Sequence, residues 1–242
     1  MQTIISGNSA GEELIKAKEA INQFLNSCSH SLRGPLKSIS GLNLLLKGVV
    51  TNGTDDPLMY IDMIAKSVSQ LEALLQQFEG FLETSRKQLT LEPVNIDRLV
   101  DEVLAEVKKE TTFHDVQVKF ALQQEGRLYS DASAIKLVLF HLLQNAIVFR
   151  DETKFDPRVD IQVRVTKSSC SINVCDNGIG IDHEIQPRVF ELFYRGSERS
   201  KGTGVGLYIV GEVIKKLSGT ISVHSKPGVG TNLFLWIPNT AL

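Results

Sequence analysis

The chain has 242 residues, of which 42% are hydrophobic and 22% charged, enough apolar material for one large domain or two small ones. Its formal net charge is -2, and the basic residues form no block, so nothing in the charge favours nucleic-acid binding. There is no signal-peptide pattern and no apolar run long enough to span a membrane, and three cysteines without metal-ligand spacing favour a reducing compartment. We therefore expect a cytoplasmic chain that makes no membrane contact itself, either complete or part of a longer, membrane-bound protein.

A long helix is predicted from about Gly11 to Lys47. With Ile21 as reference and about 100° per residue, seven apolar side chains fall within roughly 60° of it, namely Phe24, Leu25, Cys28, Leu32, Leu36, Ile39 and Leu42. His30 falls at about 180°, on the opposite side of the helix. Its imidazole is therefore expected to point into solvent, where it can meet another molecule. An ordinary surface histidine is the alternative interpretation of this segment alone.

A second helix follows a turn-rich connection predicted from Gly48 to Pro57. Its apolar residues repeat at alternating spacings of three and four, which is typical of one continuous apolar seam: Ile61, Ile64, Val68, Leu71, Leu75, Phe78 and Leu82. Two such helices form an antiparallel hairpin that cannot cover its own seams. We expect a dimeric four-helix bundle, the alternative being a monomer whose hairpin packs on the rest of the chain.

The second half of the chain alternates between helical and strand patterns. Asp131 is the predicted N-cap of a helix ending near Phe149, and a glycine-rich stretch opens another helix that ends near Leu217. A further helix is expected at 95–109, and strands at 116–122, 159–166, 171–175, 220–224 and 231–237. This order predicts an α+β fold, with a mixed sheet that helices cover on one face.

Three glycines, Gly202, Gly204 and Gly206, immediately precede the last predicted helix. Glycines in such a position let backbone N–H groups and the helix N-terminus approach phosphate oxygens. The stretch lacks the spacing of a P-loop and does not lie in a Rossmann strand–turn–helix unit. Taken alone, it fits a plain surface loop equally well.

Two further groups could bind a nucleotide. Asp176 ends a predicted strand beside Gly178 and Gly180, and a buried carboxylate there could accept a hydrogen bond from the exocyclic amine of adenine; an ordinary Asp-Asn-Gly turn is the alternative. His141 and Asn145 are four residues apart on one helical face. The neutral amide oxygen of Asn145 is a suitable ligand for a Mg²⁺ ion that also holds ATP phosphates.

In order and spacing, five segments resemble the H, N, G1, F and G2 boxes of the sensor histidine kinases of two-component systems: His30–Leu36, His141–Asn145, Asp176–Ile181, Val189–Arg195 and Gly202–Leu207. The resemblance runs from about residue 15 to 238. It implies a dimerisation and histidine phosphotransfer domain at 1–87, formed by the helical hairpin. It also implies a catalytic ATP-binding domain at 88–242, an α+β two-layer sandwich of the Bergerat (GHKL) type shared with gyrase, the Hsp90 chaperones and MutL.

The resemblance also implies roles for individual residues. His30 is similar to the phospho-acceptor, Asn145 to the Mg²⁺ ligand and Asp176 to the carboxylate that reads adenine. Thr231 corresponds to a hydroxyl that supports this carboxylate. Arg195 is similar to an arginine near the γ-phosphate, and Phe149 to an aromatic ring beside adenine. The nucleotide pocket and its lid would be shaped by Gly178, Gly180, Gly202, Gly204, Gly206 and Leu207.

The implied activity is that of an ATP-dependent protein histidine kinase that uses Mg²⁺. It would act as a homodimer, autophosphorylate on His30 and pass the phosphoryl group to an aspartate of a response-regulator receiver domain. His141 belongs with the catalytic residues, because it resembles the histidine found at this position in chemotaxis kinases. It argues against a gyrase-like ATP hydrolase, in which a glutamate at this position activates water.

Besides His141, three more positions depart from the family pattern. Ser31 replaces the acidic residue that accepts the proton of the acceptor histidine, so slow kinase activity is expected. Gly34 replaces the Thr or Asn that positions a water for phosphatase action, so that activity is expected to be weak or absent. Val148 replaces a lysine that contacts phosphate, with Arg150 or Lys201 as candidate substitutes. These changes leave open a second hypothesis, a catalytically weak nucleotide-binding or phosphotransfer scaffold.

Overall fold

The computed structural model describes residues 32–51, 56–86, 88–109, 116–192, 194, 196 and 204–239. The chain divides into two compact units, Met1–Glu79 and Gly80–Leu242, which are described separately below. Within the described residues, no helix combines the length and the apolar character needed to cross a membrane. A functional boundary between residues 87 and 88 stays a prediction.

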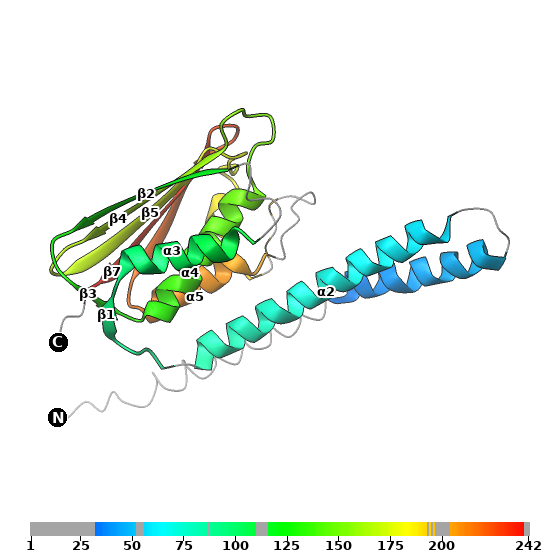
Figure 1. Ribbon diagram of the computed structural model, residues 1–242, viewed down its shortest axis with the longest axis horizontal. Helices are drawn as coiled ribbons and strands as arrows, with labels where there is room; N and C mark the ends of the chain where they lie inside the picture. The colour runs from blue at the N-terminus through cyan, green and yellow to red at the C-terminus, as the bar shows by residue number, and fades with distance from the viewer. Residues whose placement is uncertain are drawn as a thin grey trace, which may run out of the picture. The chain divides into compact units, whose positions relative to one another are not determined.

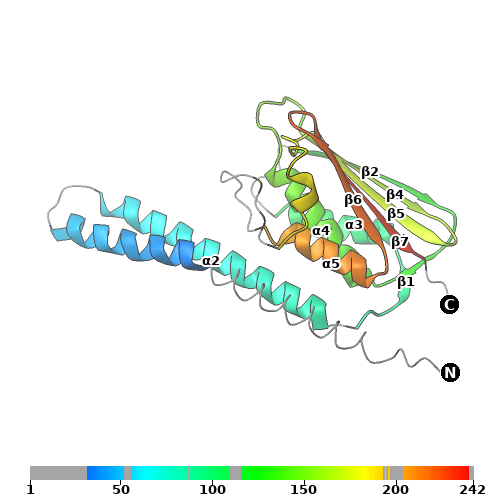
Figure 2. The same cartoon turned by 180° about the vertical axis from the view of Figure 1, so that it is seen from behind.

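The first unit contains the helical segment 32–51 and most of the helix α2 (Pro57–Arg86), and the two lie side by side in both views (Figures 1 and 2). The predicted turn-rich connection from Gly48 to Pro57 is too long, because residues 48–51 are helical. Val49 is 6% exposed and continues the apolar seam, and the Thr51 hydroxyl donates to the Lys47 carbonyl one turn earlier (2.8 Å). At the start of α2, the Asp56 carboxylate accepts from the Leu58 N–H (3.0 Å).

The predicted seam of α2 divides into two rows. Ile64 and Leu71 are half-buried and Ser67 is buried between them. The intervening positions, seven residues apart, are much more open to solvent, at 48%, 40% and 52% exposed for Ile61, Val68 and Leu75. In the preceding helical segment Leu42 is buried but Leu36 is 51% exposed. Within the described residues of this unit, one apolar row of the seam is therefore largely open to solvent.

The second unit is built on a mixed five-stranded sheet in the order β2-β4-β5-β7-β6. Only the pair β2 and β4 is parallel, and the other three pairs are antiparallel. The strands are β2 (Gln117–Gln124), β4 (Arg158–Val165), β5 (Ser169–Asp176), β6 (Thr220–Lys226) and β7 (Gly230–Pro238). The helices α3 (Ile96–Val107), α4 (Ala132–Val148) and α5 (Gly206–Lys216) cover one face of this sheet (Figures 1 and 2). The predicted α+β fold is confirmed for this unit.

Local sequence explains where the helices of this unit begin. The Asn95 side chain accepts from the Arg98 N–H (3.0 Å) at the start of α3, and the Asp131 carboxylate accepts from the Ala134 N–H (2.9 Å) at the start of α4. The predicted Asp131 cap is thus confirmed. The second Asp131 oxygen accepts from the Thr90 N–H (2.9 Å), which fastens the segment before α3 to the start of α4.

Two short strands were not predicted. β1 (Glu92–Val94) and β3 (Leu128–Ser130) form a separate antiparallel pair, with Val94 opposite Leu128, and both of these side chains are buried. Three residues are too few for a visible alternation of apolar and polar positions. The single helical turn η2 (Gln186–Arg188) was not predicted either, because it too has only three residues, which are too few to show a helical repeat.

Candidate nucleotide-binding site

Most of the predicted nucleotide-binding residues belong to three parts of the second unit: α4, the turn after β5 and the start of α5. The described ones are His141, Asn145, Phe149, Asp176, Gly178, Gly180, Gly204, Gly206, Leu207 and Thr231. The predicted phospho-acceptor His30, together with Arg195 and Gly202, lies outside the described residues. The described residues therefore bear on the binding of a nucleotide and not on a reaction at His30.

Asp176 is the last residue of β5 and pairs with Thr231 in β7. Its Oδ1 accepts two backbone N–H groups, from Gly178 (2.8 Å) and Thr231 (3.2 Å). Burial raises the pKa of Asp176, while the two N–H groups and the nearby Lys154 charge lower it. Among the described residues, Oδ2 accepts no hydrogen bond. The carboxylate is therefore held by one oxygen and offers the other as an acceptor for a ligand.

The Thr231 hydroxyl faces Ser225 rather than Asp176, at 2.9 Å between the two hydroxyl oxygens. The Ser225 hydroxyl also donates to the Gly230 carbonyl (2.8 Å) and accepts from the Ile181 N–H (2.8 Å). Ser225 thus links the turn after β5 to the ends of β6 and β7. Sequence reasoning missed it, since a serine near a strand end carries no distinctive signal.

The turn after β5 is packed so tightly that two of its positions admit no side chain. A Cβ at Gly178 would collide with the Phe149 carbonyl oxygen. A Cβ at Gly180, where φ is +72°, would collide with the Lys226 carbonyl oxygen. The Ile179 N–H donates to the same Phe149 carbonyl (3.0 Å). The end of α4, where Phe149 is the C-cap, is thereby fastened directly to the turn that carries Asp176.

His141 and Asn145 carry buried polar atoms that the rest of the described structure does not satisfy. Neither the Nδ1 of His141 nor the Nδ2 of Asn145 has a hydrogen-bond partner among the described residues. Burial is the main cause that lowers the pKa of His141 from 6.5 to about 4, and a hydrogen bond with Gln144 opposes it. The imidazole is therefore neutral near pH 7. Unpaired buried polar atoms are rare and are often satisfied by a ligand.

Both unpaired atoms lie next to the start of α5. A Cβ at Gly206, the first residue of that helix, would lie 3.4 Å from His141 Nδ1 and 3.9 Å from Asn145 Nδ2. No described side chain caps this end of α5, and Gly204 just before it has a φ of 74°. Leu207, the second residue of α5, is half-buried. Free N–H groups at a helix start next to unpaired polar atoms suit phosphate oxygens.

The described residues contain no cluster of three or more His, Cys, Asp or Glu side chains that could hold a metal ion. A divalent cation at Asn145 would therefore take most of its oxygen ligands from phosphate groups and water, which is how Mg²⁺ is commonly bound. The buried side-chain amide of Asn145 fits this arrangement. An amide flip exchanges the positions of its two terminal atoms and so presents Oδ1 in place of the unpaired Nδ2.

Of the two candidate substitutes for the missing lysine, only Arg150 is described. Its guanidinium donates to the Ile147 carbonyl (3.2 Å) and pairs loosely with Glu152 (3.5 Å). Its charge is thus used at the C-terminus of α4, where a cation is favourable. Lys201 lies outside the described residues, and the side chain of Val148 is exposed.

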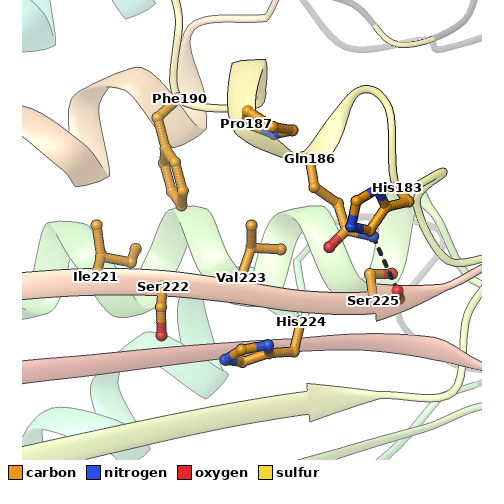
Figure 3. Close-up of a pocket in the computed structure, with 9 residues that line it drawn as sticks. All are labelled: His183, Gln186, Pro187, Phe190, Ile221, Ser222, Val223, His224 and Ser225. Atoms are coloured by element: carbon orange, nitrogen blue, oxygen red, sulfur yellow. Dashed lines mark hydrogen bonds between the residues drawn. The ribbon is translucent and has the colours of Figure 1, made fainter.

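A separate cavity of about 610 Å³ lies between the η2 segment and the edge strand β6 (Figure 3). Phe190 and Pro187 face Ile221 and Val223 across it, and the Gln186 side chain donates to the Ser225 carbonyl (2.9 Å) at one end. None of the predicted nucleotide-binding residues lines this cavity. It is therefore distinct from the candidate site.

Comparison with known proteins places these features in a family. The model described as histidine kinase-, DNA gyrase B-, and HSP90-like ATPase matches residues 130–241, which include all the described candidate residues. The sensor-like histidine kinase SenX3 of Mycobacterium tuberculosis is 30% identical over 232 residues, covering 92% of this chain and 55% of SenX3. The chain thus spans about half the length of this curated relative.

Two solved structures share the fold. Histidine kinase ThkA in complex with the response regulator protein TrrA has a TM-score of 0.73 and 22% identity, over 98% of this chain and 68% of that one. Full-length ShkA in complex with AMPPNP has a TM-score of 0.62 and 20% identity, over 90% of this chain and 46% of that one. Residues 130–241 therefore match the histidine kinase-, DNA gyrase B- and HSP90-like ATPase family, and the chain is similar to a sensor-like histidine kinase over 92% of its length.

Proposed function

We propose that the chain is the ATP-dependent core of a protein histidine kinase, which autophosphorylates on His30 and passes the phosphoryl group to an aspartate of a response-regulator receiver domain. One observation carries the proposal. Among the described residues, one oxygen of Asp176 accepts no hydrogen bond, and His141 and Asn145 carry buried polar atoms without a partner. These two atoms lie beside the start of α5, which no described side chain caps, and all of these groups fall within the part of the chain that matches this ATPase family.

Each end of a bound ATP has suitable partners. Oδ2 of Asp176 accepts a hydrogen bond from the exocyclic amine of adenine, which guanine lacks at that position, and Phe149 flanks the base. The N–H groups at Gly206 and Leu207 bind phosphate oxygens. Asn145 would be the protein ligand of a Mg²⁺ ion, which would neutralise charge on the phosphates. His141 stays neutral and adds one hydrogen-bonding nitrogen beside the phosphates.

The reaction at His30 needs few protein groups. An imidazole nitrogen attacks the γ-phosphorus in line, the bond from phosphorus to the β,γ-bridging oxygen breaks, and ADP leaves. The imidazole must also lose a proton when it becomes phosphorylated. Ser31 cannot accept it near neutral pH, so the proton passes to water and the reaction is slow.

The receiver domain is the proposed partner because the ThkA structure contains a histidine kinase together with a response regulator. The same proposal assigns residues 1–87 to dimerisation and phosphotransfer, and residues 88–242 to catalysis in the cytoplasm. The exposed row of Ile61, Val68 and Leu75 supports a homodimer, since a second hairpin would cover it and complete a four-helix bundle.

The decisive experiment incubates the full chain with Mg²⁺ and γ-labelled ATP. We expect a labelled protein band that is labile in acid and stable in alkali, and its loss in the His30→Gln and Asn145→Ala variants. His183→Gln, at an exposed histidine, and Asn173→Ala, on the sheet face away from the helices, are the matched controls and should label like the parent.

Two outcomes would contradict the proposal. Labelling that persists in His30→Gln would place the phosphoryl group elsewhere. A parent that binds ATP but never becomes labelled would favour the scaffold hypothesis. A Ser31→Glu variant then separates the cases, because a large gain in label means that the site lacks only a base.

A further inference from the structure

The ammonium group of Lys154 lies in an unusual site, formed by four backbone carbonyl oxygens. Its Nζ donates to the carbonyls of Asn177 (2.6 Å), Gly178 (3.3 Å), Gly228 (2.8 Å) and Val229 (3.2 Å). The Asp151 carboxylate adds a looser ion pair at 3.8 Å. We refer to these four oxygens as the four-carbonyl site.

The four-carbonyl site joins three segments that are distant in sequence. Lys154 follows α4, Asn177 and Gly178 form the turn after β5, and Gly228 and Val229 form the turn between β6 and β7. The turn after β5 is also bonded to the segment after α4 through Asn177, whose side chain accepts from the Arg158 N–H (2.8 Å) and donates to the Asp156 carbonyl (2.9 Å). The Lys154 side chain contacts both turns at once.

A positive charge suits this place for a simple electrostatic reason. Four carbonyl dipoles converge with their negative ends on one point, which is unfavourable unless a cation or several donors lie between them. The Lys154 side chain is only 25% exposed, so much of the repulsion would be unscreened without the ammonium group. The contact distances of 2.6–3.3 Å are those at which carbonyl oxygens hold an ammonium group, and carbonyl rings hold K⁺ in a similar way.

The same two turns hold Asp176. Oδ1 of Asp176 accepts from the N–H of Gly178, whose carbonyl contacts Lys154. Its other donor is Thr231, two residues after Val229. A shift of either turn would therefore change the orientation of the carboxylate and the direction of its free oxygen.

We propose that Lys154 is a positioning residue for the base-binding end of the nucleotide site, where its ammonium group holds the turns at 177–178 and 228–229 together so that Asp176 presents Oδ2 to the base. The inference rests on the proposed binding of ATP. It assigns to a lysine outside every recognised sequence motif a role in nucleotide affinity.

The test measures ADP binding to the full chain by calorimetry. In Lys154→Ala and Lys154→Met, ADP should bind about tenfold more weakly than in the parent, because a charge-assisted set of hydrogen bonds is lost. Lys167→Met, at an exposed lysine in the turn between β4 and β5, is the matched control and should bind like the parent. Thermal unfolding without ligand checks that each variant is folded.

Ion rescue gives the discriminating measurement. Lys154→Ala vacates the four-carbonyl site, so NH₄⁺ or K⁺ should restore most of the ADP affinity, whereas Li⁺ or tetramethylammonium at equal ionic strength should not. In Lys154→Met the side chain fills the approach, and no ion should restore affinity. If the alanine variant does not fold, the tenfold loss in the methionine variant decides the question.

Either of two results would overturn the inference: unchanged ADP affinity in Lys154→Ala and Lys154→Met, or weakened affinity in Lys154→Ala that responds equally to K⁺ and Li⁺. Failure of the proposed function has a different signature. There the parent itself would not bind ADP, or Asp176→Asn would bind it as tightly as the parent does.

Discussion

The two units of the chain use apolar side chains in different ways. In the second unit, the core beneath the sheet is complete: Leu143, Ile161 and Val213 are each 2% exposed or less. In the first unit, the described residues of the hairpin bury Leu42 and Val49 but leave Ile61, Val68 and Leu75 largely open. The apolar residues of the second unit's core are thus covered within that unit, whereas the described residues of the first unit leave part of its seam exposed.

The difference shows that a regular heptad pattern does not by itself reveal how many neighbouring helices pack against the helix that carries it. In α2 the half-buried row of Ile64 and Leu71 is sufficient for a hairpin. The second row, displaced by half a heptad, has no partner among the described residues of its unit. Such a double row is typical of a helix with neighbours on two sides, as in a four-helix bundle.

The largest effect is expected from breaking the exposed row. The double variant Ile61→Asp with Val68→Asp would bury two charges per chain in the proposed dimer, so the dimer should dissociate about a thousandfold more readily, or about 4 kcal/mol. Sedimentation analysis over a range of protein concentrations measures the change. The ATPase-like unit should unfold as it does in the parent.

Gln70→Asp, at an exposed polar position of the same helix, is the control and should leave the association unchanged. A double variant that dimerises as tightly as the parent would mean that the open row is not the interface. The hairpin would then have to be covered by another part of its own chain.

A smaller effect is expected of pH on the stability of the second unit, through the buried side chain of His141. Because burial lowers the pKa of His141 from 6.5 to about 4, the unfolded chain binds a proton between these values while the folded chain does not. Stability should therefore rise as pH increases from 4 to 6.5, by up to about 3 kcal/mol from this residue, and level off above. Urea unfolding at several pH values measures the slope.

The slope due to His141 is isolated by comparison with His141→Gln, in which that contribution should vanish. His183→Gln, at an exposed histidine, should keep the full slope. If the parent and His141→Gln show the same pH dependence, folding does not lower the pKa of this imidazole, and burial does not hold it in its neutral form.

The smallest effect is expected at the start of α4. Asp131→Ala removes the bonds to the N–H groups of Ala134 and Thr90, so the free energy of unfolding of the second unit should fall by about 1–2 kcal/mol. Urea unfolding at neutral pH detects it. Asp97→Ala, in the exposed first turn of α3, should lower the free energy of unfolding by less than half as much. Equal losses in the two variants would mean that the hydrogen bonds of the Asp131 cap contribute no more than a surface carboxylate does.

The fold of the second unit was largely predictable because its signals are local. Asn95 and Asp131 each cap a helix that begins one residue later, and β4, β5 and β7 alternate between buried and open positions over eight or nine residues. The errors occur where local signals are weak or misleading. The glycine at position 48 suggested a helix end. The helix continues because burying the Val49 side chain in the seam stabilises it by more than a glycine within the helix destabilises it.

The candidate site was predictable only in part. The resemblance implied that the Thr231 hydroxyl supports the Asp176 carboxylate. The strands do pair these two residues in register, but the Thr231 backbone N–H donates to the carboxylate in place of the hydroxyl. The contacts of Ser225 and Lys154 could not be predicted. Their partners come from segments up to 75 residues away, and a contact with a backbone carbonyl leaves no trace in the sequence of the partner.

The uncapped start of α5 has a consequence for the exchange of backbone amide hydrogens with solvent. The β5 amides are paired along the whole strand with neighbours on both sides, and so they open only with the unit as a whole. The first N–H groups of α5 are not held by any described side chain, so they exchange early in the free protein. A ligand whose oxygens occupy them would slow that exchange there first, long before the protection of the sheet changes.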